Sequence, residues 1–124
     1  MANKLKAIID LGSLKAKLTV FDSQTLDLFF QQSYLTLLGK SMSEEGLIVE
    51  EALNRLDQAL ASIKGELGAI DCINIQFIAT ESLRLAKNKD EVYQLVEKYF
   101  PGQAVTILDQ ELEGEMFFRV VSHC

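Results

Sequence analysis

The sequence predicts an α/β fold: a mixed five-stranded sheet with helices packed on it, in the order β-β-β-α-β-α-β-α. The first third of the chain holds alternating apolar stretches separated by turn residues, a pattern typical of neighbouring antiparallel strands. The remainder alternates strand-like apolar runs with stripes of helical period, which places helices against a sheet. A chain of 124 residues has the usual length of one domain.

The first two strands are expected to form a hairpin. An apolar run over residues 6–9 enters a turn at residues 10–13, and alternation resumes over residues 16–20. Such a pattern indicates two antiparallel strands joined by a tight glycine turn. A third strand is predicted over residues 26–35, which are rich in aromatic and apolar side chains. The connection that follows, residues 38–46, is polar and bounded by glycine, and it carries no recognisable chemistry.

The turn of the hairpin could bind an anion. Asp10, Gly12 and Ser13 place an acidic side chain, a hydroxyl and several backbone N–H groups at the end of a strand. Glycine lets the backbone approach a ligand closely, and successive N–H groups can form a concave anion site. An ordinary hairpin turn is the alternative interpretation, because Asp, Gly and Ser are common turn residues.

An amphipathic helix gives the strongest periodic signal in the chain. It is predicted to end near Gly65, and its charged face is explained by solvation. Its apolar stripe, at steps of three and four, consists of Val49, Leu53, Leu56, Leu60 and Ile63.

The carboxyl-terminal half alternates strands and helices. Residues 70–79 are predicted to form a buried strand. Asn88 is expected to cap a helix, with Glu91 completing a capping-box-like pair. A short strand follows over residues 104–108, and Asp109 is expected to cap the last helix.

Composition excludes several classes of protein. The formal charge of −6, from 12 basic and 18 acidic residues, argues against nucleic acid as a partner. No apolar run approaches the roughly 20 residues that span a bilayer, and the first residues do not resemble a secretory signal, so a cytoplasmic protein without a membrane partner is expected. Cys72 is expected to be a core thiol and Cys124 an exposed end. With His123 as the single histidine, a structural zinc site is not expected.

Three stretches resemble one protein family. Residues 79–88, Ala-Thr-Glu-Ser-Leu-Arg-Leu-Ala-Lys-Asn, look like the A-T-x-A-L-R-x-A-x-N signature of the exopolyphosphatase and guanosine pentaphosphate phosphohydrolase (Ppx/GppA) family. Residues 107–114 are similar to its I-[IL]-S-G-x-E-E-A stretch, and residues 9–13 resemble its first phosphate loop. The resemblance covers essentially the whole chain. It implies one lobe of the ribonuclease-H-like (actin-like ATPase) fold.

The resemblance also implies an activity and a set of site residues. Members of this family remove the terminal phosphate from inorganic polyphosphate or guanosine pentaphosphate (pppGpp) with a divalent cation, for which Mg²⁺ is expected. Asp10, Gly12 and Ser13 match the phosphate loop, Arg84 matches an arginine near the phosphate channel, and Glu113 matches a glutamate that positions or deprotonates the attacking water. Plainer alternatives stay open. The carboxylate of Glu113 could simply stabilise the N-terminus of its helix through the helix dipole, and Arg84 could be a solvated surface residue.

The sequence departs from the family at several polar positions. Leu14 and Lys15 stand where the family has Asn and Ser, and Leu112 replaces a glutamate. A polar group lost from such a site can cost about a hundredfold in rate. Two hypotheses follow. The chain belongs to a phosphohydrolase, or it belongs to a degenerate family member that binds a nucleotide, polyphosphate or a protein without hydrolysis.

The chain also stops before the second phosphate loop of the family. We therefore expect residues 1–124 to be a single N-terminal lobe, without a second lobe in this chain. Half of a cleft cannot enclose a phosphate or hold the cation, so the isolated lobe is expected to be inactive and to hold no cofactor. Without a cover, its inter-lobe surface could also pair two copies into a homodimer.

Overall fold

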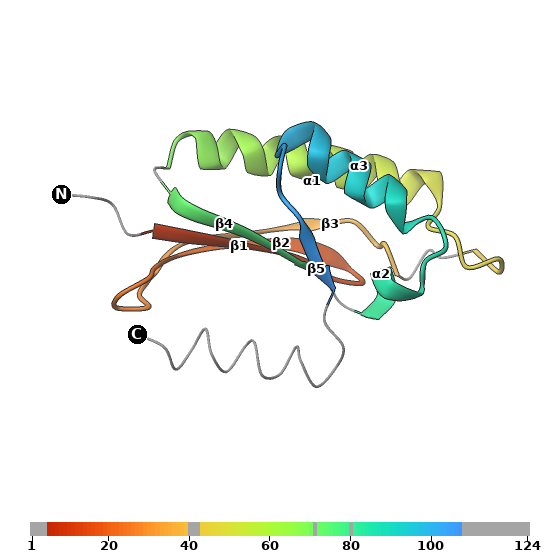
Figure 1. Cartoon of the computed structure of the whole chain (residues 1–124), viewed down its shortest axis with the longest axis horizontal. Helices are drawn as coiled ribbons and strands as arrows, with labels where there is room; N and C mark the ends of the chain where they lie inside the picture. Colours follow the sequence, from red (N-terminus) through yellow and green to blue (C-terminus); the bar gives the residue numbers. More distant parts are fainter. Residues whose placement is uncertain (1–4, 40–42, 71, 80, 108–124) are drawn as a thin grey trace.

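The alternating stretches form one sheet. The structure, a computed structural model, describes residues 5–39, 43–70, 72–79 and 81–107 (Figure 1). In chain order its elements are β1 (Leu5–Leu11), β2 (Lys15–Asp22), β3 (Leu28–Leu35), α1 (Glu50–Gly68), β4 (Cys72–Ala79), α2 (Glu81–Leu85), α3 (Lys89–Tyr99) and β5 (Val105–Ile107).

Strand direction gives the sheet one edge with a special role. The strands lie in the order β3-β2-β1-β4-β5. β2 is antiparallel to both β1 and β3, whereas β4 is parallel to β1 and to β5. Four strands therefore run in one direction and end on the same side of the sheet. We call this side the carboxyl edge; it is formed by the ends of β1, β3, β4 and β5, at Leu11, Leu35, Ala79 and Ile107.

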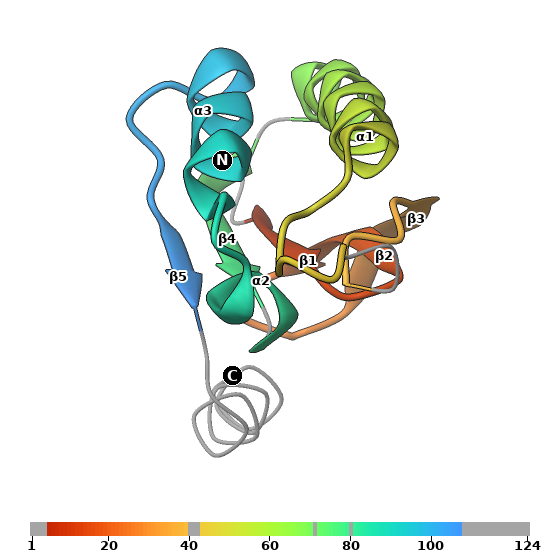
Figure 2. The ribbon, with the colours of Figure 1, turned by 90° about the vertical axis from the view of Figure 1, so that its right-hand side faces the viewer.

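The core lies between one face of the sheet and the helices α1 and α3, which cover that face side by side (Figures 1 and 2). Alternate residues of the central strands are buried there because successive side chains of a strand point to opposite faces. The strands contribute Leu5, Ala7, Ile9, Leu11, Ala16, Leu18, Val20, Phe77 and Ala79. The helices contribute Ala52, Leu56, Ala59, Leu60, Ile63, Leu67, Val92 and Val96.

The predicted fold class is confirmed, and the predicted element order is confirmed as far as β5, with one addition. The helix α2 was not expected, because a turn of five residues is too short to show a helical period. Helix α1 also ends later than predicted, at Gly68, since Leu67 adds another buried side chain one turn after Ile63. The predictions for Asp109, the last helix, Cys124 and the side chain of Cys72 lie outside what the structure describes.

The predicted cap at Asn88 is confirmed in its position and in its pairing with Glu91, but the capping hydrogen bond to the helix backbone is absent. Asn88 does occupy the position before α3, but its side chain makes no capping hydrogen bond. Its Oδ1 instead accepts the N–H of Ile48 at 2.8 Å, and its Nδ2 donates to the carbonyl of Ile48 at 3.1 Å and to the carboxylate of Glu91 at 2.6 Å. The Asn88 Oδ1 thus bonds to a residue 40 positions away along the chain and not to the N–H groups of its own helix. Asn88 thus ties the start of α3 to the segment before α1.

Glu66 carries an unfavourable charge at the end of α1. Its side chain is partly buried, and Oε1 is buried with no hydrogen-bond partner among the described residues. Burial raises the pKa of Glu66. The last turn of a helix also repels an anion through its exposed carbonyl groups, and this turn contains no basic residue.

We expect Glu66→Gln to raise the free energy of unfolding at pH 7 by up to about 1 kcal/mol. A carboxyl with a raised pKa is penalised when charged, so the gain exists above its folded pKa and fades as the pH falls towards about 4. Urea denaturation at pH 7 and at about pH 4 measures this gain in the free energy of unfolding. Glu51→Gln, in the favourable first turn of the same helix, is the control and should give no gain. An equal gain from Glu66→Gln at both pH values would show that charge is not the cause.

Candidate functional site

Asp10 lies at the carboxyl edge, one residue before the end of β1. It pairs with Lys17 of β2 and Ile78 of β4. Its neighbours Ile9 and Leu11 are fully buried against the helices, so Asp10 lies on the opposite face of the sheet. Its carboxylate is only partly solvated, because Oδ1 is buried. Asp10 thus places a carboxylate at the carboxyl edge of the sheet.

The predicted tight glycine turn between β1 and β2 is confirmed. The N–H of Gly12 donates to the carbonyl of Lys15 at 3.0 Å. A Cβ atom built on Gly12 would lie 3.3 Å from that carbonyl oxygen, closer than an ordinary contact, so a larger residue would push this oxygen away by a few tenths of an ångström. Because the Gly12 N–H already has an acceptor, it is not available to an anion.

The peptides after Gly12 are oriented by the segment that follows β3. The carbonyl of Ser13 accepts the N–H of Gly39 at 3.0 Å, and the carbonyl of Leu14 accepts those of Thr36 and Leu37 at 3.0 and 2.9 Å. In a trans peptide the N–H points away from the preceding carbonyl, and no described peptide is cis. The N–H of Leu14 therefore points away from residues 36–39.

Arg84 reaches the same edge from another element. β4 ends at Ala79, which pairs with Leu11 of β1 and with Ile107 of β5. Helix α2 begins two residues later and lies beside the ends of these strands (Figure 2). Leu83 is buried, whereas Arg84 is exposed. The structure therefore brings Asp10, Gly12, Ser13 and Arg84 to one edge of one sheet.

Glu113, which is predicted to position or deprotonate the attacking water, lies outside the described residues. β5 ends at the carboxyl edge, six residues before it. An extended chain of that length spans at most about 20 Å. The position of Glu113 at this edge stays a prediction.

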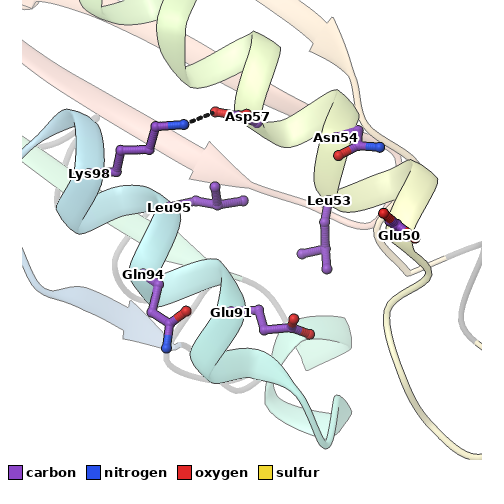
Figure 3. A pocket seen from close by; sticks show the side chains of 8 residues that line it. All are labelled: Glu50, Leu53, Asn54, Asp57, Glu91, Gln94, Leu95 and Lys98. Carbon is purple, nitrogen blue, oxygen red and sulfur yellow. Dashed lines mark hydrogen bonds and ion pairs between the residues drawn. The ribbon is translucent and has the colours of Figure 1, made fainter.

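A groove lies between α1 and α3, and the polar side chains in and beside it hold the two helices together. It has a volume of about 390 Å³ and lies on the outer side of the two helices (Figure 3). Asp57 of α1 pairs with Lys98 of α3 at 3.3 Å and accepts the hydroxyl of Tyr99. The Tyr99 hydrogen bond, followed by Lys98, lowers the pKa of Asp57. These contacts tie the helices together, away from the carboxyl edge.

Residues 36–39 are a part of the site that the sequence did not reveal. The polar connection that starts here shows no motif, yet its backbone holds the turn beside Asp10. Such hydrogen bonds join main-chain groups more than 20 residues apart, and main-chain groups leave no mark in the sequence.

The fold and this edge define the class: the chain is an α/β protein with a mixed five-stranded sheet and a glycine turn between its first two strands. A model of the Ppx/GppA phosphatase family matches residues 19–124. The chain therefore belongs to the Ppx/GppA phosphatase family.

Solved and curated relatives agree with this assignment. A Ppx/GppA family member from Aquifex aeolicus superposes with a TM-score of 0.84 at 26% identity, over 96% of this chain and 39% of its own. An exopolyphosphatase from Cytophaga hutchinsonii shares the fold, with a TM-score of 0.81 at 23% identity, over 93% of this chain and 37% of its own. A guanosine-5'-triphosphate,3'-diphosphate pyrophosphatase from Pseudoalteromonas translucida is 31% identical over 122 residues, which cover 94% of this chain.

The chain is short beside these relatives. It spans 24% of the curated pyrophosphatase and under two fifths of each of the two solved structures. Within the described residues, no helix is both long and apolar enough to cross a membrane.

Proposed function

We propose that this chain is the N-terminal lobe of a phosphohydrolase that releases the terminal phosphate from inorganic polyphosphate or guanosine pentaphosphate. The gathering of Asp10, Gly12, Ser13 and Arg84 at the carboxyl edge supports this most directly. A second lobe, carrying the second phosphate loop, would face this edge and close the cleft. The isolated chain would then be inactive.

The chemistry suits these residue types. Phosphoryl transfer depends mainly on positioning and on neutralising the oxygens of the transferred group. Arg84 would supply positive charge, and the turn at Ser13 and Leu14 would supply hydrogen-bond donors. Glu113 would orient or deprotonate the attacking water.

A divalent cation would bind at this edge through few protein ligands together with the substrate, as Mg²⁺ commonly does. Within the described residues, no three carboxylate, histidine or cysteine side chains gather to form a metal site. Mg²⁺ commonly binds through one or two carboxylates together with substrate phosphates and water. Asp10 would be the carboxylate that holds it, and the bound cation would neutralise phosphate charge.

Exposed apolar side chains at the carboxyl edge fit a surface that another lobe covers. Leu85 follows Arg84 and is 65% exposed, and Leu14 in the turn is 47% exposed. Apolar surface beside a binding site commonly marks an interface. The same surface would favour pairing of two copies if the second lobe is missing.

Arg84→Ala tests the proposal in the full-length protein. We expect KM for polyphosphate to rise about tenfold or more, because a hydrogen bond to a charged group is worth about 1.5–3 kcal/mol. Folding should be unaffected, since Arg84 is exposed. Phosphate release measures the first and thermal unfolding the second. Lys64→Ala, an exposed cation of α1, is the control. An Arg84→Ala variant with unchanged KM and kcat would contradict the proposal.

A degenerate, non-catalytic family member is the second candidate, and Leu14 favours it. This exposed leucine occupies the turn where the family has an amide side chain. Such a protein would bind a nucleotide, polyphosphate or a protein partner without hydrolysis. Calorimetric titration with polyphosphate beside the release assay separates the two: binding without release supports the second candidate, and release excludes it.

A further inference from the structure

Residues 36–39, which we call the turn support, hold the predicted phosphate turn by its backbone. Three of their N–H groups donate to the turn: those of Thr36 and Leu37 to the carbonyl of Leu14, and that of Gly39 to the carbonyl of Ser13. The two peptides that follow Ser13 and Leu14 thereby lose their freedom to rotate. The shape of the turn depends on this support.

The turn support keeps two unfavourable features. Leu37 has a φ of 58°, in the left-handed region that residues other than glycine rarely adopt. Thr36 is 0% exposed, and its Oγ1 is buried without a hydrogen-bond partner among the described residues. Features of this kind persist where the surroundings enforce them, and they cluster at functional sites. The surroundings here must therefore hold Thr36 firmly.

Arg55 of α1 supplies that hold. Its Nε donates to the carbonyl of Thr36 at 2.8 Å, and its side chain is partly buried. Thr36 is thus bound on both sides, by its N–H to the turn and by its carbonyl to the helix. Because α1 covers one face of the sheet and Asp10 lies on the other, Arg55 does not share the face of the phosphate site.

We propose that Arg55 is a positioning residue for the phosphate site. Through Thr36 it fixes the Ser13–Leu14 turn in the shape that receives the substrate phosphate. This inference rests on the proposed function, since it assumes that the turn contacts phosphate. It assigns Arg55 no contact with the substrate. The effect of Arg55 therefore passes through the turn and not through Arg84.

Two variants of Arg55 in the full-length protein separate its hydrogen bond from its charge. Arg55→Met removes the donor and should raise KM for polyphosphate about tenfold, with kcat within about twofold. Arg55→Gln places an N–H donor the same number of bonds from the backbone as Nε, without the charge, and should keep KM within about twofold of the parent. Lys64→Met, which removes an exposed cation from the same helix, is the control. If Gln raises KM as much as Met, or if neither raises it, the inference is overturned.

Double variants show which contact Arg55 acts through. Combined with Ser13→Ala, Arg55→Met should raise KM by less than the product of the separate effects, because both act on one turn. Combined with Arg84→Ala, the effects should multiply. Equal coupling to both would indicate general loosening and overturn the inference. If Ser13→Ala and Arg84→Ala alone leave KM unchanged, the proposed function itself fails. Should Arg55→Met not fold, Arg55→Leu, which also lacks the donor, tests the same rise in KM, and an unchanged KM in this variant would overturn the inference.

Discussion

Replacing Glu113 by glutamine in the full-length protein should lower kcat for phosphate release by about a hundredfold or more, because general-base catalysis contributes about 10²–10⁴-fold. Glutamine keeps the size of the side chain but cannot accept a proton from the attacking water. KM should stay within about twofold, because the phosphate contacts proposed here belong to the turn and to Arg84. Steady-state release of phosphate from polyphosphate and from guanosine pentaphosphate measures both constants.

Glu111→Gln is the matched control for this experiment. It removes an acid of the same kind two residues earlier in the chain and should leave kcat within about twofold. If Glu113→Gln turns over like the parent protein, Glu113 does not act on the water. If both variants lose activity equally, the loss reflects the negative charge of this segment and not a specific role of Glu113.

Phe77→Ala should give the largest loss of stability, about 3–5 kcal/mol in the free energy of unfolding. Phe77 is 0% exposed on the interior strand β4, and its ring meets that of Phe100 edge-on with centroids 5.2 Å apart. Truncation would leave a cavity beneath α3 and remove this aromatic contact. Urea denaturation of the 124-residue chain measures the change in the midpoint.

Phe29→Ala gives the comparison on the same sheet. Phe29 lies on the edge strand β3 and is 60% exposed, so its truncation should cost less than about 0.5 kcal/mol. The two variants remove the same atoms, and only burial differs. Similar costs for both would mean that Phe77 is not buried in the core.

Local signals in the sequence were sufficient for most of the fold. The two-residue period of β1 and β2 and the stripe of α1 are written in consecutive residues, and the structure follows them. Two features depended on distant contacts instead. The helix α2 is too short to carry a period, and Asn88 bonds to Ile48 because that backbone lies beside it in the folded chain.

The candidate site divides in the same way. The motifs pointed to Asp10, Gly12, Ser13 and Arg84. The strand register places Asp10 at the carboxyl edge, and the turn and helix α2 that bear the other residues follow strand ends at this edge. Sequence patterns could not show that the Gly12 N–H is already bonded within the turn. Nor could they identify Arg55, since its partner is a main-chain carbonyl 19 residues away.

A crystal structure of the full-length protein with bound inorganic phosphate would test the central proposal most directly. We expect the phosphate within hydrogen-bond distance of the Ser13–Leu14 turn and of Arg84, with Glu113 facing it across the carboxyl edge. A phosphate bound elsewhere, with Ser13 and Glu113 on opposite sides of the molecule, would contradict it.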